Sequence, residues 1–237
     1  PKTPKPQLYG KFIPFSINYK IFLKMKSASI LLIGAASAKW GLGSCPKGIE
    51  YMNNLDMEAY SGHWFEVYRD QWNMYTTMAD CVTKEFEFNE NGNLDLYFRG
   101  FYNFHGWGKY SGINGELSQC GTSNSFYGEP YTCQASMGYS SHQHGFKMLA
   151  TDYDNYDIYY DCHEHHGIFH NTNLAITSRT QEMSEEVQQE VKRVIEEKLP
   201  SYNLRDGMYW TKQGEDKCTY YWMDENDGQF PPRSYWY

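Results

Sequence analysis

The sequence lacks several features that mark other classes of protein. No segment reaches the roughly 18 consecutive apolar residues that a membrane-spanning helix needs. The cysteines form no Cys-x-x-Cys pair, so structural zinc held by thiolates is not expected. Internal repeats and low-complexity tracts are absent as well. The 21 Lys and Arg are outnumbered by 29 Asp and Glu and concentrate at the N-terminus, which argues against a nucleic-acid-binding surface.

Aromatic residues are abundant instead. The 237 residues include 22 Tyr, 13 Phe and 7 Trp, which together make 18% of the chain. A hydrophobic content of 41% and a charged content of 21% exclude disorder throughout. Few stretches are rich in Leu, Ala, Glu and Lys, so the aromatic bias favours strands over helices.

The N-terminal segment has the pattern of a cleaved export signal. Residues 1–24 precede the first methionine, and we interpret them as an extension upstream of the native start. From Met25 a lysine, the apolar run Ile30–Ile33 and the small residues Ala36–Ala38 follow, which predicts a signal peptide over residues 25–38. Cleavage after Ala38 leaves 15 basic and 29 acidic residues, a net charge of −14. We therefore expect a secreted, acidic protein.

A bacterial lipoprotein box is an alternative interpretation of the same region, because Leu42–Cys45 reads Leu-Gly-Ser-Cys. Lys39 and Trp40 interrupt the apolar run before it, which argues against that alternative.

Secretion predicts that the six cysteines form three disulfides. Six cysteines allow fifteen pairings, and their spacing alone does not choose among them. They are Cys45, Cys81, Cys120, Cys133, Cys162 and Cys218.

Short alternating segments separated by turn signals such as Asn91-Gly92 predict eight strands. One helix is predicted from Ser184 to about Leu199, with Ser184 as N-cap and Pro200 after its end. Its apolar residues follow i, i+4, i+7, i+8 and i+12, so one face must pack on another element. We expect an all-β fold, an eight-stranded antiparallel up-and-down barrel with one C-terminal α-helix packed outside. The strand segments are Trp64–Asp70, Cys81–Phe88, Leu94–Phe101, Lys109–Leu117, Tyr131–Met137, Phe146–Thr151, Tyr156–Cys162 and Leu174–Arg179.

Three motifs, in order along the chain, resemble those of the lipocalins. Gly62-His63-Trp64 matches the Gly-x-Trp signature, Thr151-Asp152-Tyr153 opens the second motif, and Arg179 stands where the third motif has its arginine. The positions of Cys45, Cys81 and Cys162 are similar to those of the apolipoprotein D-like subgroup. The resemblance implies a lipocalin domain over residues 39–218, followed by an aromatic-rich tail over residues 219–237.

The same resemblance implies the disulfide pairing. It gives Cys45–Cys162 and Cys81–Cys218, and it leaves Cys120 and Cys133 for a third bridge that departs from the subgroup. An arginine stacked on an aromatic plug would close the narrow end of the barrel. We therefore assign a structural role to the motif residues Gly62, Trp64, Thr151, Asp152, Tyr153 and Arg179.

The alternation of side chains along the strands predicts which residues line the barrel. A bridge at Cys81 must lie outside the barrel, so Val82 and every second residue after it point inward. Cys162 also faces outward, which places alternate residues of the seventh predicted strand, beginning with Asp157, inside the barrel. Such a lining suits one small apolar ligand with an oriented head group, although the same side chains could simply fill a solid core. The predicted lining is Val82, Lys84, Phe86, Phe88, Leu94, Leu96, Phe98, Asp157, Tyr159 and Asp161.

Seven of the eight histidines fall in or near the loops predicted at the open end of the barrel. Converging imidazoles can ligate a metal ion or haem iron, or can gate the mouth by their protonation near pH 6. A solvated hairpin with incidental histidines is the plain alternative. The candidates for metal ligation are His142, His144, His163, His165 and His166, with His105 and His170 nearby.

We predict a secreted carrier of a small hydrophobic ligand such as a lipid, retinoid, sterol or pigment, with no cofactor and no nucleic-acid partner. An enzyme that uses an inward carboxylate, such as a de-epoxidase or an isomerase, is the alternative class. The aromatic tail Thr219–Tyr237 suggests a third possibility, contact with the outside of the barrel, a membrane or a protein partner. The sequence does not indicate the oligomeric state.

Overall fold

The computed structural model describes residues 40–70, 79–104, 107–120, 125–126, 129–138, 143–202, 204 and 208–222. Residues 1–38, His105, His142 and the end of the predicted tail from residue 223 lie outside these ranges, and so do the predictions that concern them. Among the helices in the described ranges, none combines the length and the apolar character that crossing a membrane requires.

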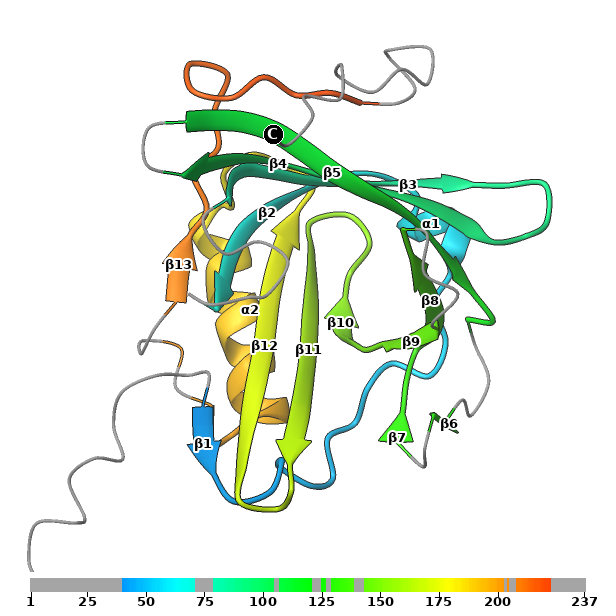
Figure 1. Cartoon of the computed structure of the whole chain (residues 1–237), viewed down its shortest axis with the longest axis vertical. Helices are drawn as coiled ribbons and strands as arrows, with labels where there is room; N and C mark the ends of the chain where they lie inside the picture. Colours follow the sequence, from blue (N-terminus) through cyan, green and yellow to red (C-terminus); the bar gives the residue numbers. More distant parts are fainter. Residues whose placement is uncertain are drawn as a thin grey trace, which may run out of the picture. The chain divides into compact units, whose positions relative to one another are not determined.

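Antiparallel strands form a nearly closed barrel (Figure 1). The hydrogen-bonded order is β10-β11-β12-β2-β3-β4-β5-β8-β9. Only Lys147 separates β9 from β10, so these two short strands form one broken wall that pairs with β8 on one side and β11 on the other. The predicted eight-stranded up-and-down barrel is therefore confirmed. The wall strands are β2 (Gly62–Asp70), β3 (Ala79–Phe88), β4 (Leu94–Phe104), β5 (Trp107–Ser118), β8 (Cys133–Met137), β9 (Gln143–Phe146), β10 (Met148–Thr151), β11 (Tyr156–His165) and β12 (Phe169–Ser178).

The structure also contains several smaller elements in addition to the wall strands. The strand β1 (Trp40–Leu42) pairs with the start of β12, and β13 (Met208–Trp210) pairs with the end of β2. A four-residue helix, α1 (Met57–Tyr60), precedes β2, and its N-cap Asp56 accepts a hydrogen bond from the Ala59 amide. The pair β6 (Ser125–Phe126) and β7 (Glu129–Pro130) forms a separate two-stranded sheet.

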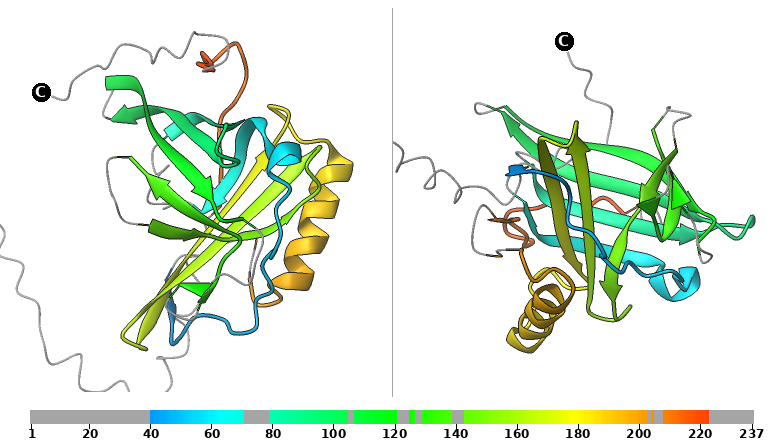
Figure 2. Two further views of the ribbon diagram at one scale, coloured as in Figure 1. Left: turned by 90° about the vertical axis from the view of Figure 1, so that its right-hand side faces the viewer. Right: turned by 90° about the horizontal axis from the view of Figure 1, so that it is seen from below.

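The helix α2 (Glu185–Lys198) lies against the outer face of the barrel (Figure 2). Ser184 caps its N-terminus by accepting a hydrogen bond from the Val187 amide, as the sequence predicts. Its apolar stripe packs on outward side chains of β11 and β12, because alternate residues of a strand face opposite sides. The buried helix residues are Val191, Val194 and Ile195, and the strand residues they join include Ile158, Tyr160, Leu174 and Ile176.

The strand β2 changes the face that its residues present. The register against β12 shifts between Ile176 and Thr177, which marks a β-bulge. As a result Val67 packs in the outer cluster under α2, whereas Arg69 points to the same side as Glu66 and donates a hydrogen bond to it. Two charged side chains therefore enter the barrel from one strand.

Residues 208–222 form a C-terminal strap that fills the seam between β2 and β3. Those two strands pair only from Gly62–Phe86 to Phe65–Thr83 and then diverge. In the gap, the Cys81 amide donates to the Lys212 carbonyl at 2.8 Å, and the Gln213 side-chain amide donates to the carbonyls of both Glu66 and Val82 at 2.9 Å. The strap thus joins the two strands where they no longer bond to each other.

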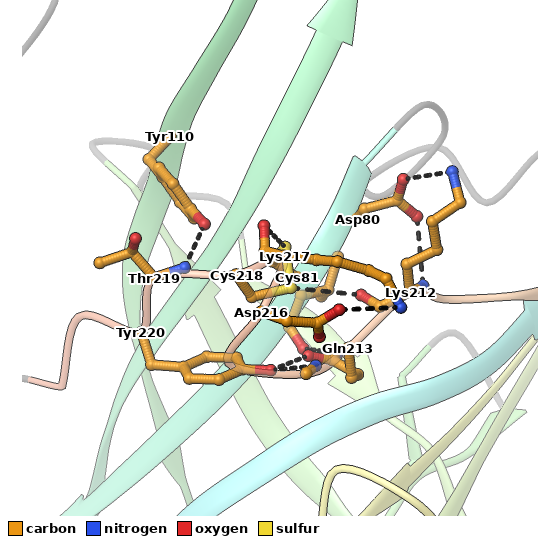
Figure 3. Close-up of a disulfide and its surroundings, with 12 residues drawn as sticks. Asp80, Cys81, Tyr110, Lys212, Gln213, Asp216, Lys217, Cys218, Thr219 and Tyr220 are labelled. Carbon is orange, nitrogen blue, oxygen red and sulfur yellow. Dashed lines mark hydrogen bonds and ion pairs between the residues drawn. A yellow bond between two sulfur atoms is a disulfide. The ribbon is translucent and has the colours of Figure 1, made fainter.

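Three disulfides tie the chain together, Cys45–Cys162, Cys81–Cys218 and Cys120–Cys133. This is the pairing that the resemblance to the apolipoprotein D-like subgroup implies. Cys81–Cys218 fixes the strap, which also bonds to β5 through the Thr219 amide and the Tyr110 hydroxyl (Figure 3). Beyond it, Trp222 is buried and stacks on His63 at 3.9 Å between ring centroids. The first four residues of the predicted tail therefore cover the barrel wall.

Candidate functional site: a lined cup inside the barrel

The barrel encloses a cavity of about 390 Å³, a volume within the range of roughly 300–1,000 Å³ that small-molecule sites occupy. Strands β2, β3, β4, β5, β8, β9, β11 and β12 all contribute side chains to it. The apolar part of the lining is Phe86, Leu96, Phe98, Ile113, Leu117, Ala135, Met137, Phe146 and Ala175. The polar part includes Glu66, Lys84, Tyr102, Ser111, His144, Tyr159 and Asn173.

Five of the ten residues predicted to line the barrel lie in this lining: Lys84, Phe86, Leu96, Phe98 and Tyr159. Val82 is buried beside Phe98 but is not part of the lining, and Leu94 is buried in the cluster around Trp64 at the closed end. Phe88 is 51% exposed, so the inward assignment is wrong for this residue. It pairs with Leu94 at the last position of β3, next to the turn, where the strand has passed the end of the interior.

Trp64 and Arg179 close the narrow end of the barrel. The Arg179 guanidinium lies 3.8 Å from the centre of the buried Trp64 ring. Its nitrogens donate to the backbone carbonyls of Ser61 at 2.8 Å, Ala59 at 3.0 Å and Tyr153 at 2.9 Å. Burial lowers the pKa of Arg179 from its usual value, although nearby acidic groups oppose this effect. The arginine therefore joins the first, second and third motif regions in one contact set.

Gly62 is required by the same contact. Its φ of +98° is a backbone conformation that side-chain-bearing residues rarely adopt. A Cβ at this position would also lie 3.1 Å from the Arg179 guanidinium nitrogen. The glycine of the first motif thus allows β2 to begin directly against Arg179.

The second motif builds the turn between β10 and β11. Asp152 accepts hydrogen bonds from the amides of Asn155 at 2.8 Å and Tyr156 at 2.9 Å, and Thr151 Oγ1 donates to the Tyr156 carbonyl at 2.6 Å. Burial raises the pKa of Asp152, but these hydrogen bonds outweigh that effect and hold it below its usual value. Tyr153 accepts from the Asp56 amide through its hydroxyl, which links the turn to α1.

Asp157 belongs to the closed end rather than to the cup. The Tyr60 hydroxyl donates to its Oδ2 at 2.7 Å, and the Thr177 hydroxyl donates to the same oxygen. Burial, followed by the charge of Asp157, raises the pKa of Tyr60 well above its usual value. This carboxylate therefore holds a buried hydrogen-bond network in place.

Asp161 lies near the mouth and is paired twice. Its oxygens lie 2.8 Å from Lys147 Nζ and 2.7 Å from His163 Nε2. Burial raises the pKa of Asp161, but the hydrogen bonds and charges of His163 and Lys147 prevail and lower it. The prediction that Asp161 contacts ligand finds no support in the lining, because the side chain is not part of it.

The described histidines do not converge. His165 bonds Asn171 and stacks on Phe169, and His170 bonds the Gly43 carbonyl. His166 is exposed in the turn, whereas His144 lines the cup from β9. Within the described part of the chain no group of three or more His, Cys, Asp or Glu side chains is placed to hold a metal ion. The hypothesis of a metal or haem site at the mouth therefore has no ligand set there.

Several lining residues escaped the sequence prediction. Glu66 follows Trp64 by two positions, so alternation along the strand could have placed it inside, but a carboxylate is not an obvious lining residue. Asn173 and Ala175 could have been found from their cross-strand partners Asp161 and Tyr159. The Oδ1 atom of Asn173 is buried and accepts no hydrogen bond from any described group.

A nearly closed antiparallel barrel with one plugged end, an apolar cup and an outer helix is typical of the lipocalin class of ligand-binding barrels. Residues 61–204 match the Lipocalin / cytosolic fatty-acid binding protein family, and the chain belongs to this family.

The chain is similar in sequence to individual proteins and in fold to a solved structure. The chain is 27% identical to apolipoprotein D of Bos taurus over 157 residues, which covers 62% of this chain and 73% of the relative. It is 24% identical to the outer membrane lipoprotein Blc of Escherichia coli strain K12 over 203 residues, 82% of this chain and 96% of the relative. The solved structure of insecticyanin from the tobacco hornworm Manduca sexta superposes with a TM-score of 0.60 at 21% identity, covering 77% of this chain and 93% of the other.

Proposed function

We propose that this protein binds a small hydrophobic molecule in its cup and carries it without chemical change. The observation that carries the proposal is the cavity of about 390 Å³ enclosed by eight strands and lined mainly by apolar side chains. Each CH₂ group of a ligand removed from water there contributes about 0.8 kcal/mol, so an apolar body alone supplies most of the affinity.

The chemistry of the cup favours binding over catalysis. All six cysteines are in disulfides, which leaves no thiol to act as a nucleophile. Asp157 and Asp161 already have partners outside the cup, and Glu66 forms an ion pair with Arg69. Each of these inward carboxylates therefore already takes part in bonds that hold the fold.

A secreted carrier is the form of this function that we favour. Three disulfides suit an oxidising compartment, and cytosolic proteins seldom keep them. The acidic net charge of the chain agrees with a soluble carrier.

Filling the cup tests the proposal. Ala135 lines the cavity from β8, whereas its neighbour Ser136 lies on the opposite face of the same strand. We expect wild-type protein to bind the neutral fluorescent probe N-phenyl-1-naphthylamine with one site, and A135F to bind it at least about tenfold more weakly, a loss of about 1.4 kcal/mol.

S136F is the matched control and should bind the probe as wild type does, with the circular dichroism spectra showing that all three proteins are folded. Equal binding by folded A135F and wild type would place the ligand site elsewhere and overturn the proposal.

A further inference from the structure

Lys84 is a buried lysine in the wall of the cup. It is 9% exposed and lines the cavity from the middle of β3. Its cross-strand partners are Trp64 on β2 and Phe98 on β4, so its side chain rises between two aromatic residues just above the closed end. Lysines are almost never buried this deeply unless an acid accompanies them.

No such acid accompanies Lys84 in the described part of the chain. The lysine makes no hydrogen bond and no ion pair there, whereas every other charge in the lining has a partner. Glu66, the one carboxylate of the lining, accepts from Arg69 at 2.6 Å and from the Thr211 hydroxyl at 3.1 Å. The pair of Glu66 and Arg69 is neutral together, so Lys84 is the charge of the cavity lining that has no partner among the described residues.

An uncompensated buried charge is costly, because the ammonium has lost most of its hydration without gaining an anion. A ligand that brings a negative group to the floor of the cup removes that cost and forms a charge-assisted hydrogen bond. The remaining lining is mainly apolar, with Phe86, Leu96 and Phe98 close by on β3 and β4. The cup therefore has one cationic point set in an otherwise hydrophobic interior.

We infer that the ligand is an amphipathic acid whose carboxylate pairs with Lys84 while its apolar body fills the rest of the cup. This inference rests on the proposed binding function and narrows it to one chemical class. A neutral molecule of the same shape gains the same apolar contacts but leaves the ammonium unpaired.

Two probes with one apolar body separate these cases. All-trans-retinoic acid and all-trans-retinol differ in the head group, a carboxylate against a hydroxyl, and each is titrated against bound N-phenyl-1-naphthylamine. We expect wild type to bind the acid roughly tenfold or more tightly than the alcohol, since a hydrogen bond to a charged group stabilises by about that factor or more. K84M should lose this preference by weakening the acid alone, and K84R should keep it.

K192M is the matched control, because it removes the same charge from the exposed face of α2 and should keep the preference. If wild type binds the naphthylamine but binds the acid no better than the alcohol, or if K84M keeps the preference, the inference is wrong and the carrier function stands. If wild type fails to bind the naphthylamine at all, the proposed function itself fails.

Discussion

Single charged residues inside this barrel differ in whether the fold itself satisfies them. Asp157 is held by Tyr60 and Thr177, Glu66 by Arg69 and Thr211, and Asp161 by Lys147 and His163. These bonds make the three carboxylates part of the scaffold. Lys84 has no such partner among the described residues, and this contrast is why we propose that Lys84 pairs with ligand.

The substitution D161N tests the pairing at the mouth. It removes the carboxylate charge that lies 2.8 Å from the buried Lys147 Nζ, so we expect a loss of about 1–3 kcal/mol in the free energy of unfolding at pH 7. The pKa of Asp161 is lowered in the folded state, so its stabilisation is complete above the unfolded value near 4 and is lost as the pH falls through the folded value.

Urea unfolding of wild type and D161N at pH 7, 5 and 3 measures this difference, which should be full at pH 7 and smallest at pH 3. E90Q, which alters an exposed carboxylate in the turn after β3, should change stability by less than about 0.5 kcal/mol. A difference that stays constant down to pH 3 would show that Asp161 does not stabilise the fold as a carboxylate.

The inward or outward direction of a side chain was predictable where a disulfide fixed the direction of one residue in the same strand. The disulfide at Cys81 set the alternation for Lys84 and Phe86, and both line the cup. Alternation could not tell where the interior ends, which is why Phe88 was misplaced. Alternation also could not show that Asp161 forms an ion pair with Lys147, which is more than ten residues away in the sequence. This ion pair holds the carboxylate outside the lining.

Among the elements, α2 depends on the outer face of the barrel for its stability. Ile195 is fully buried against β11 and β12, so I195A should cost about 2–5 kcal/mol of unfolding free energy. The cluster lies outside the barrel wall, so binding of N-phenyl-1-naphthylamine at a temperature where the variant is folded should not change.

Q189A, on the exposed face of the same helix, is the control and should leave both quantities near wild type. A loss of probe affinity in folded I195A would mean that the helix shapes the cup, contrary to the position found for it.

The strap makes a second prediction at this scale. Because residues 208–222 fill the seam between β2 and β3, the double substitution C81S/C218S should cost about 2–5 kcal/mol and should also speed release of the bound probe. Stopped-flow dilution measures the release rate. C120S/C133S cuts a disulfide that spans only 13 positions in another part of the chain and should leave the release rate unchanged. Equal release rates in the two double variants would show that the strap is not part of the wall.

The order and type of the elements were predictable, whereas their ends were not. Ser184 and Pro200 bounded the helix correctly because capping is local chemistry. The break at Lys147 was not predicted. It separates β9, which pairs with β8, from β10, which pairs with β11, so it depends on contacts between strands and not on the local sequence. The hairpin of β11 and β12 is also longer than predicted, so that His163, His165 and His170 lie in strands, where each has a different protein partner.

At the scale of the whole molecule, side chains fill the narrow end of the barrel and leave a cavity toward its other end. Trp64, Arg179 and the network around Asp157 fill the narrow end, and Phe86 and Leu96 belong both to that buried cluster and to the lining of the cup. The three motifs predicted this closure because each supplies a group to one contact set. The size of the cavity was not predictable, because it depends on the volumes of side chains from eight strands together.

Native mass spectrometry of the protein purified from its natural source tests the central claim most directly. The account predicts a complex with one small lipophilic acid per chain, which organic extraction removes and which the extracted protein takes up again with the same stoichiometry. A protein that carries nothing, and that after extraction binds no apolar probe, would contradict the claim that this barrel is a hollow carrier.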